Sequence, residues 1–155
     1  MRFAYLSLGT NVGDRAAHLE GAIPTLAMGE PFRLSKVYQT EPVGGVEQDD
    51  FWNMVMEITT EASADELLER ARRAEEDAGR TREVRWGPRT LDVDVLLVGD
   101  ETRHGPELTL PHPRMNERAF VLRPLAELAP ELVSDAQLVN ADGRVEELGT
   151  LSSLR

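Results

Sequence analysis

Apolar and polar side chains alternate with a period of two at four places in the chain, and this period is typical of β-strands. The predicted strands are residues 3–9, 32–40, 51–61 and 90–98. A Gly-rich turn, GTNVGD, follows the first of these strands. A loop rich in Pro, Gly and acidic residues, 41–50, precedes the third strand and predicts a break between strands.

Two intervening segments carry apolar residues at helical spacing. The first helix is expected from Asp14, a suitable N-cap, to about Met28, with Gly29 and Pro31 ending it. The second opens at Ser63, which with Glu66 has the spacing of a capping box, and it stops at Gly79. Pro111 and Pro113 then mark a turn, and Asn116 or Glu117 opens a short helical segment.

The predicted order is β-α-β-β-α-β, followed by a C-terminal extension that contains an Asp-Gly turn signal for a small hairpin. This order is typical of an α+β, ferredoxin-like core, with an antiparallel sheet and helices on one face. The pattern shows neither an internal repeat nor a linker. We therefore expect residues 1–155 to form one domain.

Composition narrows the possible partners. The chain has 155 residues, 41% hydrophobic and 29% charged, with a formal net charge of −11. So acidic a surface disfavours nucleic acid and anionic lipid, and no apolar run approaches the roughly 20 residues of a membrane span. There is no cysteine, which excludes thiolate chemistry and fits a cytoplasmic protein.

Two carboxylates, Asp92 and Asp94, interrupt the fourth predicted strand. Successive side chains in a strand point to opposite faces, so both aspartates share one face, with Cα atoms about 6.5–7 Å apart. One interpretation is a solvated acidic face. The other is a magnesium site, because Mg²⁺ prefers a few carboxylate oxygens together with phosphate and water.

Arginines gather just before this strand and favour the metal interpretation. Arg80, Arg82, Arg85 and Arg89 lie within ten residues, and guanidinium groups bind phosphate oxygens bidentately. The alternative is ion pairing with Glu75, Glu76, Asp77 and Glu83, and we expect it for the helical arginines Arg70, Arg72 and Arg73. For Arg82 and Arg89 we favour a role in binding a nucleotide triphosphate.

Two further segments offer binding side chains. His112, between two prolines and close to Arg114 and Arg118, is a candidate for phosphate or hydroxyl contact. His18 and His104 are expected to be structural or exposed. An aromatic ring together with an amide suits a flat heterocycle, and Thr40, Phe51 and Asn53 supply this combination. Alternatively, Phe51 and Trp52 are core residues.

Five segments in order give the chain a family resemblance. They are LSLGTNVGD, YQTEPVGGVEQDDFWN, EEDAGRTR, RWGPRTLDVDVLL and LPHPRMNERAFVLRPL. Together the segments resemble the 6-hydroxymethyl-7,8-dihydropterin pyrophosphokinases of folate biosynthesis. The resemblance covers nearly the whole chain except the final twenty or so residues. It departs from the family pattern at Thr10 and Asn116, where Ser and His are expected.

The resemblance implies transfer of a pyrophosphoryl group from ATP to the pterin hydroxymethyl oxygen, with release of AMP. It implies two Mg²⁺ ions held by Asp92 and Asp94, and catalytic roles for Arg80, Arg82 and Arg89. The ATP-binding residues it implies are Leu68, Glu75, Arg82, Arg89, His112 and Arg118. The pterin-binding residues it implies are Thr40, Val43, Phe51, Asn53 and Phe120.

The sequence leaves some alternatives open. No side chain clearly fits the role of general base, which a metal-lowered alcohol pKa or an aspartate carboxylate could replace. A non-catalytic ferredoxin-like binding module and a two-metal nucleotidyl transferase are rival functions. We expect a monomer that binds small molecules and neither nucleic acid nor membrane.

Overall fold

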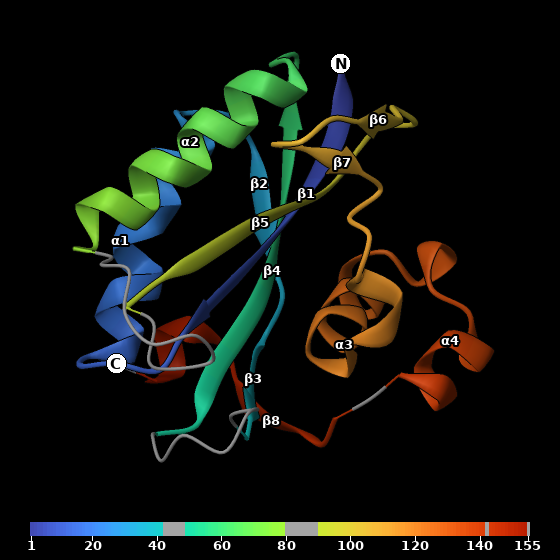
Figure 1. Ribbon diagram of the computed structural model, residues 1–155. Helices are drawn as coiled ribbons and strands as arrows, with labels where there is room; N and C mark the ends of the chain where they lie inside the picture. Colours follow the sequence, from blue (N-terminus) through green and yellow to red (C-terminus); the bar gives the residue numbers. More distant parts are fainter. Residues whose placement is uncertain (42–48, 80–89, 142, 155) are drawn as a thin grey trace.

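The structure is a computed structural model that describes residues 1–41, 49–79, 90–141 and 143–154 (Figure 1). It confirms the predicted β-α-β-β-α-β order. The elements of this core are β1 (Arg2–Thr10), α1 (Arg15–Ala27), β2 (Phe32–Leu34), β3 (Val37–Thr40), β4 (Phe51–Thr60), α2 (Ala64–Asp77) and β5 (Asp92–Val98).

The main sheet is antiparallel at every described pairing, with the strand order β5-β1-β4-β3-β8, and β2 also pairs with β4. The two longest strands, β1 and β4, are neighbours within it and pair along the whole of β1, from Arg2 opposite Thr60 to Thr10 opposite Trp52. The sheet is therefore the predicted ferredoxin-like one, and its central register fixes where the strand ends meet.

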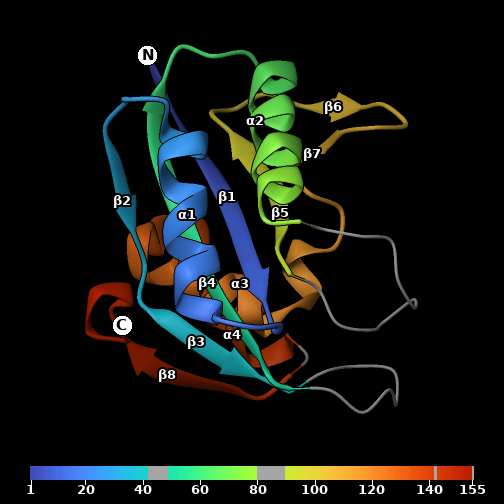
Figure 2. The same cartoon turned by 90° about the vertical axis from the view of Figure 1, so that its left-hand side faces the viewer.

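Helices α1 and α2 lie side by side on one face of the sheet (Figure 2). Both helices begin at the predicted caps: Asp14 accepts from the Ala17 N–H at 3.1 Å, and Ser63 accepts from the Glu66 N–H at 3.1 Å. The main core lies between these helices and the sheet, and its large, fully buried members include Leu6, Leu8, Leu19, Leu26, Met54, Met56, Ile58 and Leu67.

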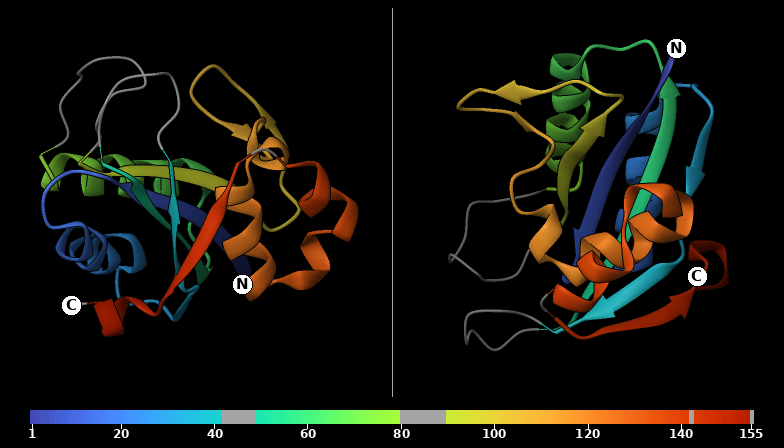
Figure 3. Two further views of the ribbon diagram at one scale, coloured as in Figure 1. Left: turned by 90° about the horizontal axis from the view of Figure 1, so that it is seen from below. Right: turned by 90° about the vertical axis from the view of Figure 1, so that its right-hand side faces the viewer.

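The opposite face is covered in part by α3 (Ala119–Leu128), so helix lies on both sides of the sheet (Figure 3). The sequence predicted helices on one face only, which holds for α1 and α2. A second core forms here from Tyr5, Val55 and Leu96 of the sheet and Leu122 and Leu125 of the helix. The short helical segment expected near Asn116 is a 3-10 turn, η1 (Met115–Glu117), directly before α3.

The predicted strand 32–40 is divided into β2 and β3 by Ser35 and Lys36. The Ser35 hydroxyl accepts a hydrogen bond from the Val55 N–H at 2.9 Å, in place of a ladder bond. The Lys36 N–H turns away from β4 and donates to the Glu127 carboxylate of α3 at 3.0 Å. Side-chain oxygens thus accept hydrogen bonds from the backbone N–H groups at the break between β2 and β3.

The predicted C-terminal hairpin is wrong. The Ser134 side chain and Gln137 form a capping box that opens α4 (Asp135–Asn140), and this local signal outweighs the Asp-Gly turn signal. After it, β8 (Val145–Gly149) pairs with β3 at the edge of the sheet. The remaining short elements are β6 (Arg103–His104), β7 (Thr109–Leu110), η2 (Pro130–Leu132) and η3 (Leu151–Leu154).

No helix in the described part of the chain is long and apolar enough to cross a membrane.

Candidate active site

The two aspartates of β5 lie on the face that α3 only partly covers. Val93 and Val95 point into the core beneath α1 and α2, so Asp92 and Asp94 point to the other side. The Asp94 side chain is 46% exposed and can reach a ligand. The strand therefore uses one face for the core and the other for carboxylates, as the alternation predicted.

The register of the sheet places the aspartates in line with the candidate pterin residues. Gly9 of β1 pairs with Asp92 on one side and with Asn53 of β4 on the other. Directly opposed residues in an antiparallel sheet point to the same face, and neighbouring strands are about 4.8 Å apart. Asp92 and Asn53 are thus separated by about 10 Å across this face.

The amide of Asn53 is held in place by its neighbour in β3. Its Nδ2 donates to the Thr40 hydroxyl at 2.9 Å, and both side chains are buried. Phe51, directly opposite Thr40, and Phe120, in the first turn of α3, are half-buried. Val43 lies outside the described residues. These residues offer a fixed polar edge and aromatic rings on the same side of the sheet.

His112 stands between the aspartates and the start of α3. Its backbone N–H donates to the Leu96 carbonyl of β5 at 2.9 Å, and its side-chain Nε2 lies 3.9 Å from Asp94 Oδ1. Burial lowers the pKa of His112, the arginines Arg118 and Arg114 lower it further, and Asp94 opposes them. Burial thus favours the neutral imidazole.

Arg118 directly precedes α3, and its guanidinium lies 5.6 Å from the centroid of the Phe120 ring. A cation at this distance from a ring face is attracted by the ring quadrupole. The contact connects a predicted ATP residue to a predicted pterin residue, so the start of α3 presents both.

Glu75 joins α2 to the strand that carries the aspartates. Its carboxylate accepts a hydrogen bond from the Val93 N–H at 2.9 Å. Val93 lies between Asp92 and Asp94 in the sequence, so this hydrogen bond fixes the position of the candidate metal site relative to α2.

A pocket of about 250 Å³ lies next to Asp94. It brings together Leu68 of α2, Asp94 of β5 and His112, three of the predicted site residues. Its other wall, formed by residues 105–109 and Pro113, was not predicted. Polar loops of this kind lack periodicity, so the sequence carried no signal for them.

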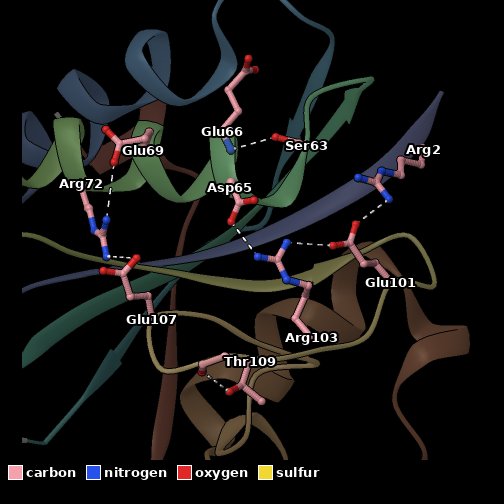
Figure 4. Close-up of polar contacts among 11 residues, drawn as sticks. Arg2, Ser63, Asp65, Glu66, Glu69, Arg72, Glu101, Arg103, Glu107 and Thr109 are labelled. Atoms are coloured by element: carbon pink, nitrogen blue, oxygen red, sulfur yellow. Dashed lines mark hydrogen bonds and ion pairs between the residues drawn. The ribbon is translucent and has the colours of Figure 1, made fainter.

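The wall of the pocket belongs to the β6–β7 hairpin, which charged side chains tie to α2 (Figure 4). Arg103 binds Asp65 at 2.7 Å and Glu101 at 3.3 Å, while Arg72 approaches Glu107 at 3.7 Å. Arg103 and Asp65 lie 38 residues apart in sequence, so spacing gave no indication of the pair.

The helical arginines Arg70 and Arg72 form ion pairs, as predicted, but with different acidic residues. Arg70 is buried and binds Glu30 at 2.6 Å and Glu66 at 2.7 Å, which connects α2 to the end of α1. The loop arginines Arg80, Arg82 and Arg89 lie outside the described residues. Their predicted roles therefore stay predictions.

The two aspartates suit a magnesium ion that is shared with phosphate. Carboxylate oxygens are the hard donors that Mg²⁺ prefers, and it is commonly held by one or two carboxylates with substrate phosphates and water. Two carboxylates on one face thus fit an ion that takes its other oxygen ligands from phosphate and water. Among the described residues, no group of three or more His, Asp or Glu side chains is placed to hold a metal ion.

Solved structures share the fold of this chain. The chain matches HPPK-DHPS of Plasmodium falciparum with a TM-score of 0.62 at 16% identity, over 99% of this chain and 43% of that chain. At this identity the match supports the fold alone, an α+β ferredoxin-like domain. The chain spans less than half the length of that structure.

Sequence comparison then gives the family. The 7,8-dihydro-6-hydroxymethylpterin-pyrophosphokinase family model matches residues 5–130. The 2-amino-4-hydroxy-6-hydroxymethyldihydropteridine pyrophosphokinase of Bacillus subtilis is 45% identical over 90% of this chain and 85% of its own. The enzyme of the same name from Methylorubrum extorquens is 46% identical over 90% of each chain. The chain belongs to the 7,8-dihydro-6-hydroxymethylpterin-pyrophosphokinase family.

Proposed function

We propose that this chain transfers the β,γ-pyrophosphoryl group of ATP to the hydroxymethyl oxygen of 6-hydroxymethyl-7,8-dihydropterin and releases AMP, as a step of folate biosynthesis. The observation that carries the proposal is the family match over residues 5–130, together with a carboxylate pair and a buried amide on one sheet face. A phosphate-binding end and a heterocycle-binding end are what this reaction needs.

The ATP end is assigned to the pocket and its surroundings. Leu68 and His112 line the pocket, where the apolar side chain would contact the nucleotide and the neutral imidazole would hydrogen-bond to it. Arg118 would bind phosphate from the start of α3, and Glu75 would hold the neighbouring strand in place. Arg82 and Arg89 would bind the outer phosphate oxygens, with Arg80 supporting them.

The pterin end is assigned to the strand ends beside α3. Asn53, fixed by Thr40, would read the hydrogen-bonding edge of the ring, and Phe51 and Phe120 would pack on its two faces. Val43 would contact the same edge. The support for this arrangement is that the described members of the set share the sheet face of the aspartates.

Asp92 and Asp94 would hold two Mg²⁺ ions through their carboxylate oxygens. When bound, these ions neutralise charge on the phosphate oxygens and lower the pKa of an attached hydroxyl group. The protein itself contributes position. The strand fixes the spacing of the carboxylates, and Asn53, which would hold the pterin edge, lies about 10 Å from Asp92 across the sheet.

We infer that residues 1–155 act as one domain, because a single sheet joins β1 to β8 and the helices pack on it. A monomer is the oligomeric state that we propose. We also infer a cytoplasmic enzyme, since its proposed co-substrate ATP is abundant there. Its partners are ATP and the pterin rather than nucleic acid or membrane, in line with the net charge of −11.

Product analysis tests the function. The protein is incubated with ATP, Mg²⁺ and 6-hydroxymethyl-7,8-dihydropterin. The nucleotides and pterins are then separated by chromatography, and their masses are measured by mass spectrometry. We expect AMP and a pterin heavier by two phosphoryl groups in equal amounts, and neither with Asp94→Asn. Release of pyrophosphate would indicate a nucleotidyl transferase instead. Binding without any product would indicate a non-catalytic module.

A further inference from the structure

Gly9 occupies the middle of the row that connects the candidate metal carboxylates to the candidate pterin amide. It pairs with Asp92 of β5 and with Asn53 of β4, so the row has side chains at both ends and none at its centre. A glycine in a central strand weakens that strand, because it adds no packing and costs conformational entropy. Its presence here needs a specific reason.

The backbone does not supply that reason. Gly9 does not have a positive φ. It pairs regularly with β4 on one side and with β5 on the other. An alanine could therefore adopt its conformation. A glycine at such a place commonly marks the close approach of another group.

The group that approaches is the Asn53 side chain. A Cβ atom at Gly9 would lie 2.9 Å from Asn53 Oδ1, closer than non-bonded atoms tolerate, whereas the next nearest atoms are 3.9 Å away. The Asn53 Nδ2 meanwhile donates to Thr40 Oγ1 at 2.9 Å. The amide is thus confined from both ends: its nitrogen is bound to β3 and its oxygen lies over β1.

We propose that Gly9 is a positioning residue for pterin recognition, because it leaves room for the Asn53 amide oxygen to lie across the sheet toward Asp92. In that position Oδ1 accepts a hydrogen bond from a ring N–H or exocyclic amine of the pterin. The inference rests on the proposed placement of pterin at Asn53. A side chain at position 9 displaces the oxygen and breaks or bends the bond to Thr40.

The test is Gly9→Ala. Fluorescence measures the equilibrium binding of pterin, and calorimetry measures the binding of a non-hydrolysable ATP analogue. We expect pterin affinity to fall at least about 10-fold, roughly one hydrogen bond to the ring. Affinity for the ATP analogue should stay within about two-fold. Gly21→Ala is the matched control, because a Cβ at Gly21 of α1 meets nothing within 4 Å.

A double-mutant cycle shows whether Gly9 acts through Asn53. In an Asn53→Ala background the clashing oxygen is gone, so Gly9→Ala should cause no further loss of pterin affinity. The double variant should also fold even if Gly9→Ala does not. Wild-type pterin affinity in Gly9→Ala, a full additional loss in the Asn53→Ala background, or a double variant that fails to fold would each overturn the inference.

The proposed function fails separately. If wild-type protein yields no AMP but binds pterin, and Gly9→Ala weakens that binding, the positioning role stands without the reaction. If wild-type protein does not bind pterin, both proposals are overturned.

Discussion

Glu57 connects β1, β2 and β4 beneath α3, and Glu57→Gln tests how firmly that helix is held. The carboxylate is 4% exposed. It accepts a hydrogen bond from the Tyr5 hydroxyl at 2.8 Å and two from Arg33, at 2.8 and 2.6 Å. Arg33 also donates to the Leu128 carbonyl at the end of α3 at 3.0 Å. The network therefore joins the sheet to the helix that presents Arg118 and Phe120.

The expected loss follows from the exposure of each partner. The bond from the buried Tyr5 hydroxyl to a carboxylate contributes about 1.5–3 kcal/mol. The Arg33 side chain is 58% exposed, so its pair with Glu57 contributes at most about 1 kcal/mol. Glutamine keeps one acceptor but not the charge. We expect a loss of about 1–3 kcal/mol, or roughly 3–10 °C in Tm for a domain of this size.

The loss depends on pH in a defined direction. Hydrogen bonding to the Arg33 guanidinium lowers the pKa of Glu57, burial opposes this, and the Tyr5 hydroxyl adds to the lowering. A carboxyl group with a lowered folded pKa stabilises fully above its unfolded value, about 4.3, and loses that contribution as pH falls through the folded value. Wild type and Glu57→Gln should therefore differ fully at pH 7, and the difference should shrink as pH falls below about 4.3 and through the lower folded pKa.

Urea unfolding at pH 7, 5 and 3 measures this difference directly. Glu147→Gln is the control, because Glu147 lies half-exposed at 3.6 Å from Lys36 and should change stability by less than about 0.5 kcal/mol. Equal stability of wild type and Glu57→Gln at pH 7 would refute the estimate. A difference that persists unchanged at pH 3 would refute the electrostatic explanation.

Three further changes address the site. Asp94→Ala should lower the rate of pyrophosphoryl transfer at least about 100-fold. The Tm of the protein without ligands should stay level, because the Asp94 side chain is half-exposed, and a large fall in Tm would indicate a structural role. Arg103→Gln should raise the KM for ATP about 2–5-fold with kcat unchanged, because the ion pair between Arg103 of the hairpin and Asp65 of α2 is lost. An unchanged KM in steady-state kinetics would contradict this. Arg89→Ala should lower single-turnover kcat at least about 100-fold, with partial rescue by Arg89→Lys, and full activity would remove Arg89 from the site.

Features that depend on neighbouring residues were predicted from the sequence. Asp14 and Ser63 cap their helices as expected, since a cap acts over three residues. The alternation around Asp92 and Asp94 placed both on the face away from the main core, because strand periodicity is local. The break at Ser35 was missed because its satisfying partners, in β4 and α3, are distant in sequence.

Features that depend on distant pairing were not predicted. The position of Asp92 opposite Gly9, and of Gly9 opposite Asn53, follows from sheet register, which no single segment contains. The pocket wall at 105–109 depends on ion pairs between the hairpin and α2. The sequence thus supplied the candidate side chains and their faces, while the structure supplied their relative positions.

A paramagnetic ion at the aspartates measures those positions most directly. With Mn²⁺ replacing Mg²⁺ and an ATP analogue bound, we expect the NMR signals of the Gly9 amide and the Asn53 side-chain amide to broaden strongly. The Met28 amide, which follows α1 on the other face and far along the sheet, should remain sharp. In Asp94→Ala the broadening should weaken. Sharp Gly9 and Asn53 signals, with broadening elsewhere in the protein, would contradict a single site joining metal, nucleotide and pterin on this face.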